Sequence, residues 1–392
     1  MSSQVNTMTL PMFAEDPNRL DAPREIPVAT PDFDLNVLGL ASLRGIGLNS
    51  ISAFVRHYDD LGQLWRDSPD TFRQILHDAR VPGSQALAEE IHNSRPRLQS
   101  EGRQQLDYLA KRNIRLISSR DSLFPQRLRD LPDAPLWLFV EGNPTVLNAG
   151  AFVAVVGTRE SSSVGVKTAE QVTWAAATAG LGLISGLAEG IDAAAHGMAV
   201  RYSVPQIAVL GTGINIIFPK TTASLRRQIV DTGGCVITEY FPNDNYGKSR
   251  FVERNRIQAG ISEAVCPVEG KSQSGTMHTV RFAGKYGRPL FGVTRGEPGL
   301  ENEIPRVLAK MGAPVFDIES TDGKTCLREF FDALPGTRFP RPDRPSPEFM
   351  FRNVLKAIDG VASYDELTRA DKLYLLEQFT KRLGLDVGNE SR

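Results

Sequence analysis

Two glycine turns that follow apolar runs carry residue types suited to binding phosphate. The first is Gly157-Thr158-Arg159, after the apolar run 151–156, and the second is Ser185-Gly186-Leu187-Ala188. Backbone amides at such turns can approach an anion closely, at the positive end of the dipole of the helix that follows. A single glycine turn is a weak signal, because a tight strand-to-helix connection also uses glycine. We interpret Gly157, Thr158, Arg159 and Gly186 as candidate phosphate contacts.

A basic run with one aromatic residue follows at 248–256. It reads Lys248-Ser249-Arg250-Phe251-Val252-Glu253-Arg254-Asn255-Arg256. Cationic side chains can pair with phosphates, while an aromatic ring can stack on an unpaired base. Charge runs are often solvated surfaces, but apolar Ile257 and Ala259 follow directly, and arginines near a core are costly to desolvate without an anionic partner. The run therefore favours a nucleic-acid backbone as ligand, with candidate contacts Lys248, Arg250, Phe251, Arg254, Asn255 and Arg256.

Other polar residues near these segments allow two interpretations each. Ser274 and Gly275 open a helix after Glu269, where they could bind an anion or cap the helix. Asp192 and His196 lie one helical turn apart, which more often gives a local hydrogen-bonded pair than a catalytic one. No serine or cysteine nucleophile lies at a recognisable spacing from them. We identify no catalytic constellation, and we expect a binding protein without cofactor or metal.

These residues must be positioned by alternating strands and helices. Strand candidates lie at 114–117, 136–140, 151–156, 181–184, 206–210, 235–238, 263–268 and 289–293, and helix candidates between them include 165–179, 190–202, 222–232 and 275–286. Such alternation predicts an α/β fold with an extended Rossmann-like, doubly wound and mostly parallel sheet. Phosphate ligands then belong at the carboxyl ends of the strands, where both glycine turns lie.

The remaining segments predict smaller units around this sheet. We expect a disordered tail at 1–30, a helical domain at 31–98, the sheet domain at 99–335, a Pro/Arg linker at 336–346 and a small helical region at 347–392. The turn Leu43-Arg44-Gly45-Ile46-Gly47 joins two helices of the first domain and could present amides to DNA. Nearby Asp59 and Asp60 slightly favour a purely structural turn.

Composition limits the classes of partner. The chain has 392 residues and a formal net charge of −1, so nucleic-acid affinity must come from a local patch. Its three cysteines lie far apart without a metal-binding spacing. We find no membrane span and no secretory signal, and we therefore expect a cytoplasmic protein.

The ordered set of segments resembles the DNA-processing protein A (DprA/Smf) family. The resemblance rests on Phe124–Leu128, Val156–Arg159, Ser185–Asp192, Val209–Gly213, Thr238–Tyr240, Phe251–Arg256 and Glu269 with Ser274-Gly275. Val252 and Arg295-Gly296 depart from the family pattern, which indicates a divergent member. The resemblance implies sequence-independent binding of single-stranded DNA, a homodimer, and loading of the RecA recombinase in recombination and natural transformation.

Two alternatives remain open from the sequence. The atypical ends of the chain favour a regulatory partner in a toxin–antitoxin or anti-phage defence pair, which is compatible with DNA binding. The sheet and its glycine turns would also serve a nucleotide-binding enzyme of the phosphoribohydrolase kind. Against this, 270–276 lacks the paired glycines and the glutamate that such enzymes carry in this loop.

Overall fold

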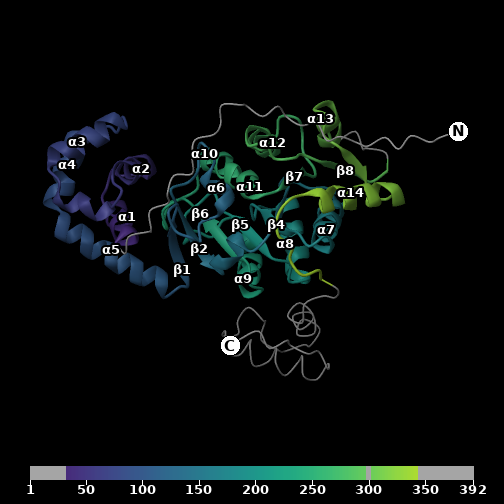
Figure 1. The fold of residues 1–392 in the computed structure, drawn as a ribbon, viewed down its shortest axis with the longest axis horizontal. Coiled ribbons are helices and arrows are strands. Elements are labelled where there is room, and N and C mark those ends of the chain that lie inside the picture. Colours follow the sequence, from purple (N-terminus) through teal and green to yellow (C-terminus); the bar gives the residue numbers. More distant parts are fainter. Residues whose placement is uncertain (1–31, 297–301, 343–392) are drawn as a thin grey trace, which may run out of the picture.

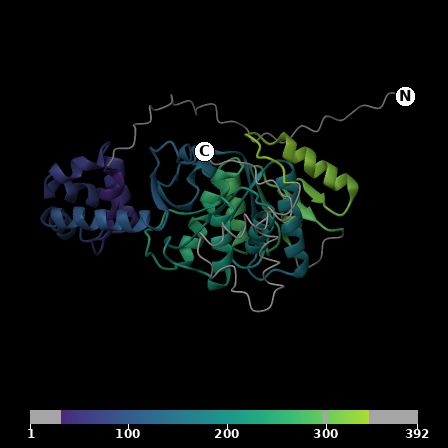
Figure 2. The ribbon, with the colours of Figure 1, turned by 90° about the horizontal axis from the view of Figure 1, so that it is seen from below.

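The computed structural model of the chain describes residues 32–296 and 302–342 (Figure 1). The expected tail at 1–30, the appendage at 347–392 and the end of the linker therefore lie outside the described residues. A helical unit comes first and lies at one end of the molecule in both ribbon views (Figures 1 and 2). Its elements are α1 Phe33–Ala41, α2 Leu48–His57, η1 Leu61–Arg66, α3 Pro69–Asp78, α4 Ser84–Asn93 and α5 Arg95–Ala110.

The expected domain boundary between residues 98 and 99 falls inside α5. This helix packs along α1, with Gly39 of α1 and Gly102 of α5 at the crossing. The whole of α5 therefore belongs with the helical unit, and the sheet begins directly after it.

A seven-stranded sheet occupies the centre, in the order β1-β2-β6-β5-β4-β3-β7. Strands β6, β5, β4, β3 and β7 run parallel, while β1 pairs antiparallel with β2, and β2 with β6. The expected α/β fold with a mostly parallel Rossmann-like sheet is confirmed. The strands are β1 Ile114–Ser118, β2 Trp137–Gly142, β3 Phe152–Val156, β4 Gly182–Ser185, β5 Gln206–Val209, β6 Cys235–Thr238 and β7 Ala264–Pro267.

Every residue of the central strands β3, β4 and β5 is buried. Both faces of the sheet must therefore be covered, and helices cover them. One face packs against α7 Ser163–Thr178, α8 Ile191–Arg201 and α9 Ala223–Asp231, and the other against α6 Gln126–Arg129, α11 Asn255–Ile261 and α12 Thr276–Lys285. Two single turns, η2 Pro144–Asn148 and η3 Lys220–Thr222, complete the connections.

One segment differs in part from the sequence prediction. In the strand expected at 289–293, Leu290 forms a parallel bridge with Val265 of β7, whereas β8 Gly292–Thr294 pairs with β9 Val315–Asp317 in a separate two-stranded sheet. Strands of three residues carry no readable alternation, so the sequence did not reveal this partner. Helices α13 Ile304–Lys310 and α14 Thr321–Ala333 accompany the small sheet at the opposite end from the helical unit (Figure 1).

Across the described ranges, no helix is both long and apolar enough to cross a membrane. The same residues contain no group of three or more His, Cys, Asp or Glu side chains arranged to hold a metal ion.

Candidate functional site

Loops that follow four neighbouring parallel strands meet at one edge of the sheet. Strands β5, β4, β3 and β7 are adjacent, so their carboxyl ends present these loops side by side. The strand order reverses at β3, since β4 lies on one side of it and the much later β7 on the other. An open pocket of about 460 Å³ lies at this edge, between the loop at 157–160 and the helices of the basic run.

Most of the expected contact residues line this pocket. They are Gly157, Thr158, Arg159, Lys248, Phe251, Arg254, Asn255, Ser274 and Gly275. Gly186 lines a smaller adjoining cavity, together with Arg159 and Phe251. The pocket is also lined by Tyr246, Gln258 and Thr276, which the sequence did not single out. Tyr246 could have been found as an aromatic residue two positions before the basic run.

The basic run is helical, which decides which of its side chains reach the pocket. It forms α10 Lys248–Glu253 and the first residues of α11. Positions 248, 251, 255 and 258 follow one another at helical spacing and all line the pocket. Lys248 is exposed at the rim. The Arg159 guanidinium lies 5.0 Å from the centre of the Phe251 ring, a cation–π contact that holds this second exposed cation over the ring.

Arg254 lies beneath the pocket surface and is held by the protein itself. Its side chain is 5% exposed, and its Nη1 donates to the Val209 carbonyl at 2.9 Å. Its Nη2 lies 3.8 Å from an Asp192 carboxylate oxygen. A side chain at Gly186 would overlap this guanidinium, so glycine is required there to admit it. Burial lowers the pKa of Arg254 to about 10, which still leaves it charged at neutral pH, and the Asp192 carboxylate opposes this shift.

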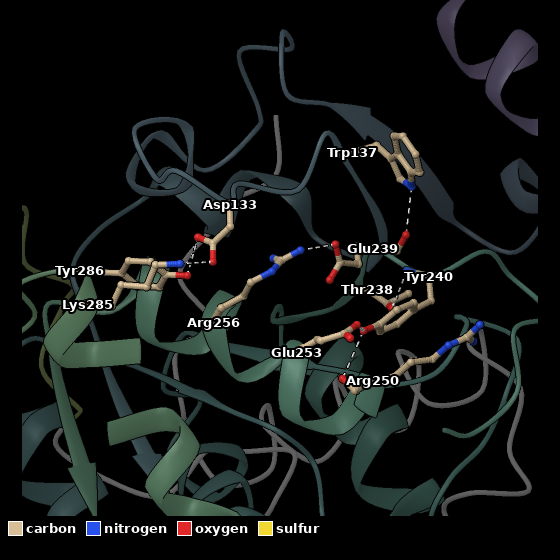
Figure 3. Close-up of polar contacts among 10 residues, drawn as sticks. All are labelled: Asp133, Trp137, Thr238, Glu239, Tyr240, Arg250, Glu253, Arg256, Lys285 and Tyr286. Atoms are coloured by element: carbon tan, nitrogen blue, oxygen red, sulfur yellow. Dashed lines mark hydrogen bonds and ion pairs between the residues drawn. The ribbon is translucent and has the colours of Figure 1, made fainter. Parts of the chain in front are cut away.

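Two expected contacts, Arg250 and Arg256, do not line the pocket. Arg250 binds the Asn245 carbonyl at 3.0 Å and the Asp244 carboxylate at 3.3 Å. Arg256 points to the other side of α11, where it pairs with Glu239 (Figure 3). A helix turns the side chains of the run onto different faces, so the run does not form one continuous surface. Contact of Arg250 and Arg256 with DNA stays a prediction.

Several of the contacts in Figure 3 join the two helices of the basic run to the residues that follow β6. Tyr240 lies 3.1 Å from a Glu253 carboxylate oxygen through its hydroxyl, and the Trp137 indole donates to the Glu239 carbonyl at 3.0 Å. Burial raises the pKa of Glu239, while the Arg256 guanidinium acts in the opposite direction. Arg256 is therefore a positioning residue for α11.

Asp192 and His196 do not form the local pair that their spacing suggested. His196 Nδ1 lies 2.8 Å from the side-chain oxygen of Gln206, and Asp192 accepts from the Gly186 amide at 3.2 Å. Burial lowers the pKa of His196 to about 4, so the ring is neutral at pH 7. It acts as a packed polar residue of the core.

The loop before α12 offers polar groups to the opposite wall of the pocket. Thr276, at the first position of this helix, is 6% exposed. Among the described residues, its hydroxyl and that of Ser274 are buried without a hydrogen-bond partner. Ser272 is engaged elsewhere, because its amide donates to Glu303 at 2.7 Å. Glu269 likewise faces α7, where it accepts from the Ser162 amide at 3.0 Å. Ser274 and Thr276 are therefore the side chains of this loop whose buried hydroxyls have no partner among the described residues.

A model of the DNA recombination-mediator protein A family matches residues 115–317, just over half of the chain. The chain belongs to this family. The matched range contains the whole pocket edge, from the first strand of the sheet to β9. The recognition of a divergent member of the DprA/Smf family from the sequence is thus confirmed.

Two relatives match large parts of the chain. Protein Smf of Escherichia coli strain K12 is 37% identical over 275 residues, which are 68% of this chain and 70% of that protein. The DNA processing protein DprA of Streptococcus pneumoniae is 38% identical over 177 residues, or 45% of this chain and 62% of that one.

Solved structures show the same fold. The X-ray structure of DprA from Streptococcus pneumoniae has a TM-score of 0.57 at 27% identity, and covers 75% of this chain and 97% of its own. A structure of DNA processing protein A from Helicobacter pylori, described by its single-stranded DNA binding mode, has a TM-score of 0.50 at 22% identity, and covers 57% and 97%.

Proposed function

We propose that this chain binds single-stranded DNA in the pocket at the carboxyl edge of the sheet, without reading base sequence, and acts in DNA processing and recombination. The observation that carries the proposal is one pocket lined by exposed cations, an aromatic ring and two hydroxyl side chains. Lys248 and Arg159 supply charge at the rim, Phe251 supplies the ring, and Ser274 with Thr276 supplies the hydroxyls. This combination is typical of proteins that hold a nucleic-acid backbone and stack on its bases.

We propose binding, and not catalysis, as the role of the pocket. Two acidic side chains line it: Asp192 is buried against Arg254, and Glu160 is exposed in the loop after β3. Since the related proteins are named as DNA processing proteins, we propose the same class of ligand for this one. The RecA contact, the homodimer, the cytoplasmic location and a defence or toxin partner stay predictions. The phosphoribohydrolase alternative also stays a prediction. In the structure the Glu269 carboxylate accepts a hydrogen bond from the Ser162 amide at the start of α7.

The proposal is tested by the salt dependence of binding to a labelled oligo-dT. We expect Lys248→Ala and Arg159→Ala each to weaken binding, and to reduce the slope of log affinity against log salt by about 0.7 to 1, because each removes one phosphate contact. The decrease should be the same for oligo-dT and for a strand of mixed sequence.

Lys310→Ala provides the matched control. This lysine is exposed on α13, within the small sheet unit and outside the pocket lining. Its substitution should leave both affinity and slope unchanged. If the parent protein does not bind oligo-dT, or if both pocket variants behave like the control, the proposed function is wrong.

A further inference from the structure

Three aromatic rings from different segments form a continuous wall beside the pocket, here called the aromatic wall. Its members are Phe218, Tyr246 and Phe251. The ring centres of Phe218 and Tyr246 are 5.1 Å apart, and those of Phe251 lie 5.7 Å from Phe218 and 5.5 Å from Tyr246. These separations are typical of directly contacting aromatic pairs. The three rings therefore support one another.

The wall divides two cavities at the same edge of the sheet. Tyr246 and Phe251 line the main pocket, whereas Phe218 and Phe251 line the smaller cavity over Gly186. Phe251 packs closely on Gly211, and the Arg159 guanidinium lies 5.0 Å from the centre of its ring. Phe251 is thus engaged from several sides and acts as the central support of the wall.

The other two rings are unusually open to solvent. Phe218 is 39% exposed and Tyr246 is 49% exposed, and the neighbouring Ile217 is 53% exposed. Contiguous exposed apolar side chains on a folded domain mark a binding surface more often than isolated ones do. Because the wall continues directly into a pocket with exposed cations, its occupant must carry both flat apolar groups and negative charge.

We propose that Phe218 and Tyr246 stack on unpaired bases of a DNA strand whose phosphates enter the pocket. This inference rests on the proposed function and adds two residues and a second binding surface. Bases of a duplex hide their faces in the helical stack, whereas the bases of a single strand expose them to aromatic rings. The aromatic wall would therefore hold the bases of the single strand, while the cations of the pocket hold its phosphates.

The test compares two labelled strands of equal length, oligo-dT and an abasic sugar–phosphate strand. We expect Phe218→Ala and Tyr246→Ala each to weaken oligo-dT binding about tenfold, in line with the usual contribution of one stacked base. The salt slope should not change, because the number of phosphate contacts is preserved. Binding of the abasic strand should be the same for the variants and the parent.

Two further variants sharpen the result. Tyr246→Phe should retain parental affinity, because it keeps the ring and removes only the hydroxyl. Tyr108→Ala is the matched control, since Tyr108 is 47% exposed on α5 and lies outside both cavities that border the wall. It should bind oligo-dT like the parent.

The outcomes separate this inference from the proposed function. If the parent binds oligo-dT but both alanine variants bind it equally well, the aromatic wall is not a base-stacking surface. The same conclusion follows if the variants lose affinity equally for the abasic strand. If the parent binds neither strand, the proposed function itself is overturned, and the inference with it.

Discussion

Arg254 shows how a residue of a binding motif can belong to the protein core. Its guanidinium lies against the backbone of Gly186, donates to Val209 and faces the carboxylate of Asp192. Both charged side chains are at least nine-tenths buried, so neither is solvated by water to any useful extent. The positive charge of Arg254 adds to the electrostatic potential of the pocket. Removing it would leave the buried Asp192 carboxylate without a compensating charge.

We therefore predict that Arg254→Ala destabilises the protein by about 3 to 5 kcal/mol, since breaking a buried pair by removing one partner has this cost. Adding Asp192→Asn to that variant should restore part of the loss, because it removes the unpaired charge. Urea denaturation followed by circular dichroism measures both. Arg159→Ala is the matched control at an exposed arginine of the same pocket, and should change stability by less than about 0.5 kcal/mol. Equal effects of the two arginine variants would contradict this assignment.

The residue types in the sequence predicted which segments meet at the pocket, but they did not predict which side chains of these segments line it. Lys248, Phe251 and Ser274 were expected to line one site, and the structure brings them together. Arg250 and Arg256 were expected there too, but they pair with carboxylates on other faces of the same helices. A one-dimensional charge run cannot distinguish these cases, because the partners Asp244 and Glu239 become neighbours only once the strand β6 and the helices are packed.

At the scale of the elements, regular strand–helix alternation was predictable and close helix contact was not. The spacing of apolar residues gave β6 with its observed bounds and placed α7 and α8 to within a few residues. Nothing in the sequence singles out Gly39 and Gly102, because the structural role of a glycine inside a helix depends on which element packs against it. In the structure they allow the backbones of α1 and α5 to touch.

We predict that Gly102→Ala lowers the stability of the helical unit by about 1 to 3 kcal/mol, the usual cost of overpacking. An added Cβ would lie 2.3 Å from the Leu35 carbonyl oxygen and 2.9 Å from the Gly39 amide nitrogen, and backbone atoms cannot move aside cheaply. Gly197→Ala on α8 is the matched control, because nothing lies within 4 Å of the Cβ it would add. It should be neutral or slightly stabilising through helix propensity. Thermal unfolding of both variants measures these changes in stability. If Gly102→Ala is as stable as the parent, the two helices can move apart without a cost in stability.

At the scale of the whole molecule, the helical unit and the sheet share one hydrophobic core. Leu38 and Leu98 of the helices belong to the same buried cluster as Leu116, Phe139 and Val236 of the sheet. The sequence predicted these two parts as separate domains, at 31–98 and 99–335. It could not reveal that the apolar face of β1, β2 and β6 continues into the helices. Because buried contacts are continuous across this junction, we expect the two parts to be strongly coupled in unfolding.

Asp34 lies in this junction and gives the coupling a pH dependence. It is in the first turn of α1, and burial raises its pKa to about 7, with the negative charge of Asp121 in the loop after β1 adding to the shift. An aspartate of the unfolded chain titrates near pH 4, roughly. Between these two values the folded state binds more protons than the unfolded state, so the contribution of Asp34 to stability decreases as the pH rises from about 4 to about 7.

Replacing Asp34 with asparagine should therefore stabilise the protein at pH 8, by about 1 to 4 kcal/mol. At pH 4 it should have little effect, because the parental carboxyl is neutral in the folded state and only about half ionised in the unfolded state. Urea denaturation of parent and variant across this range measures the difference. Asp107→Asn is the matched control, because Asp107 is exposed on α5, and its effect should not follow the same trend. A constant difference between Asp34→Asn and the parent from pH 4 to pH 8 would mean that the carboxyl ionises without hindrance, and that the junction is more open to water than the burial of its neighbours Phe33 and Leu35 implies.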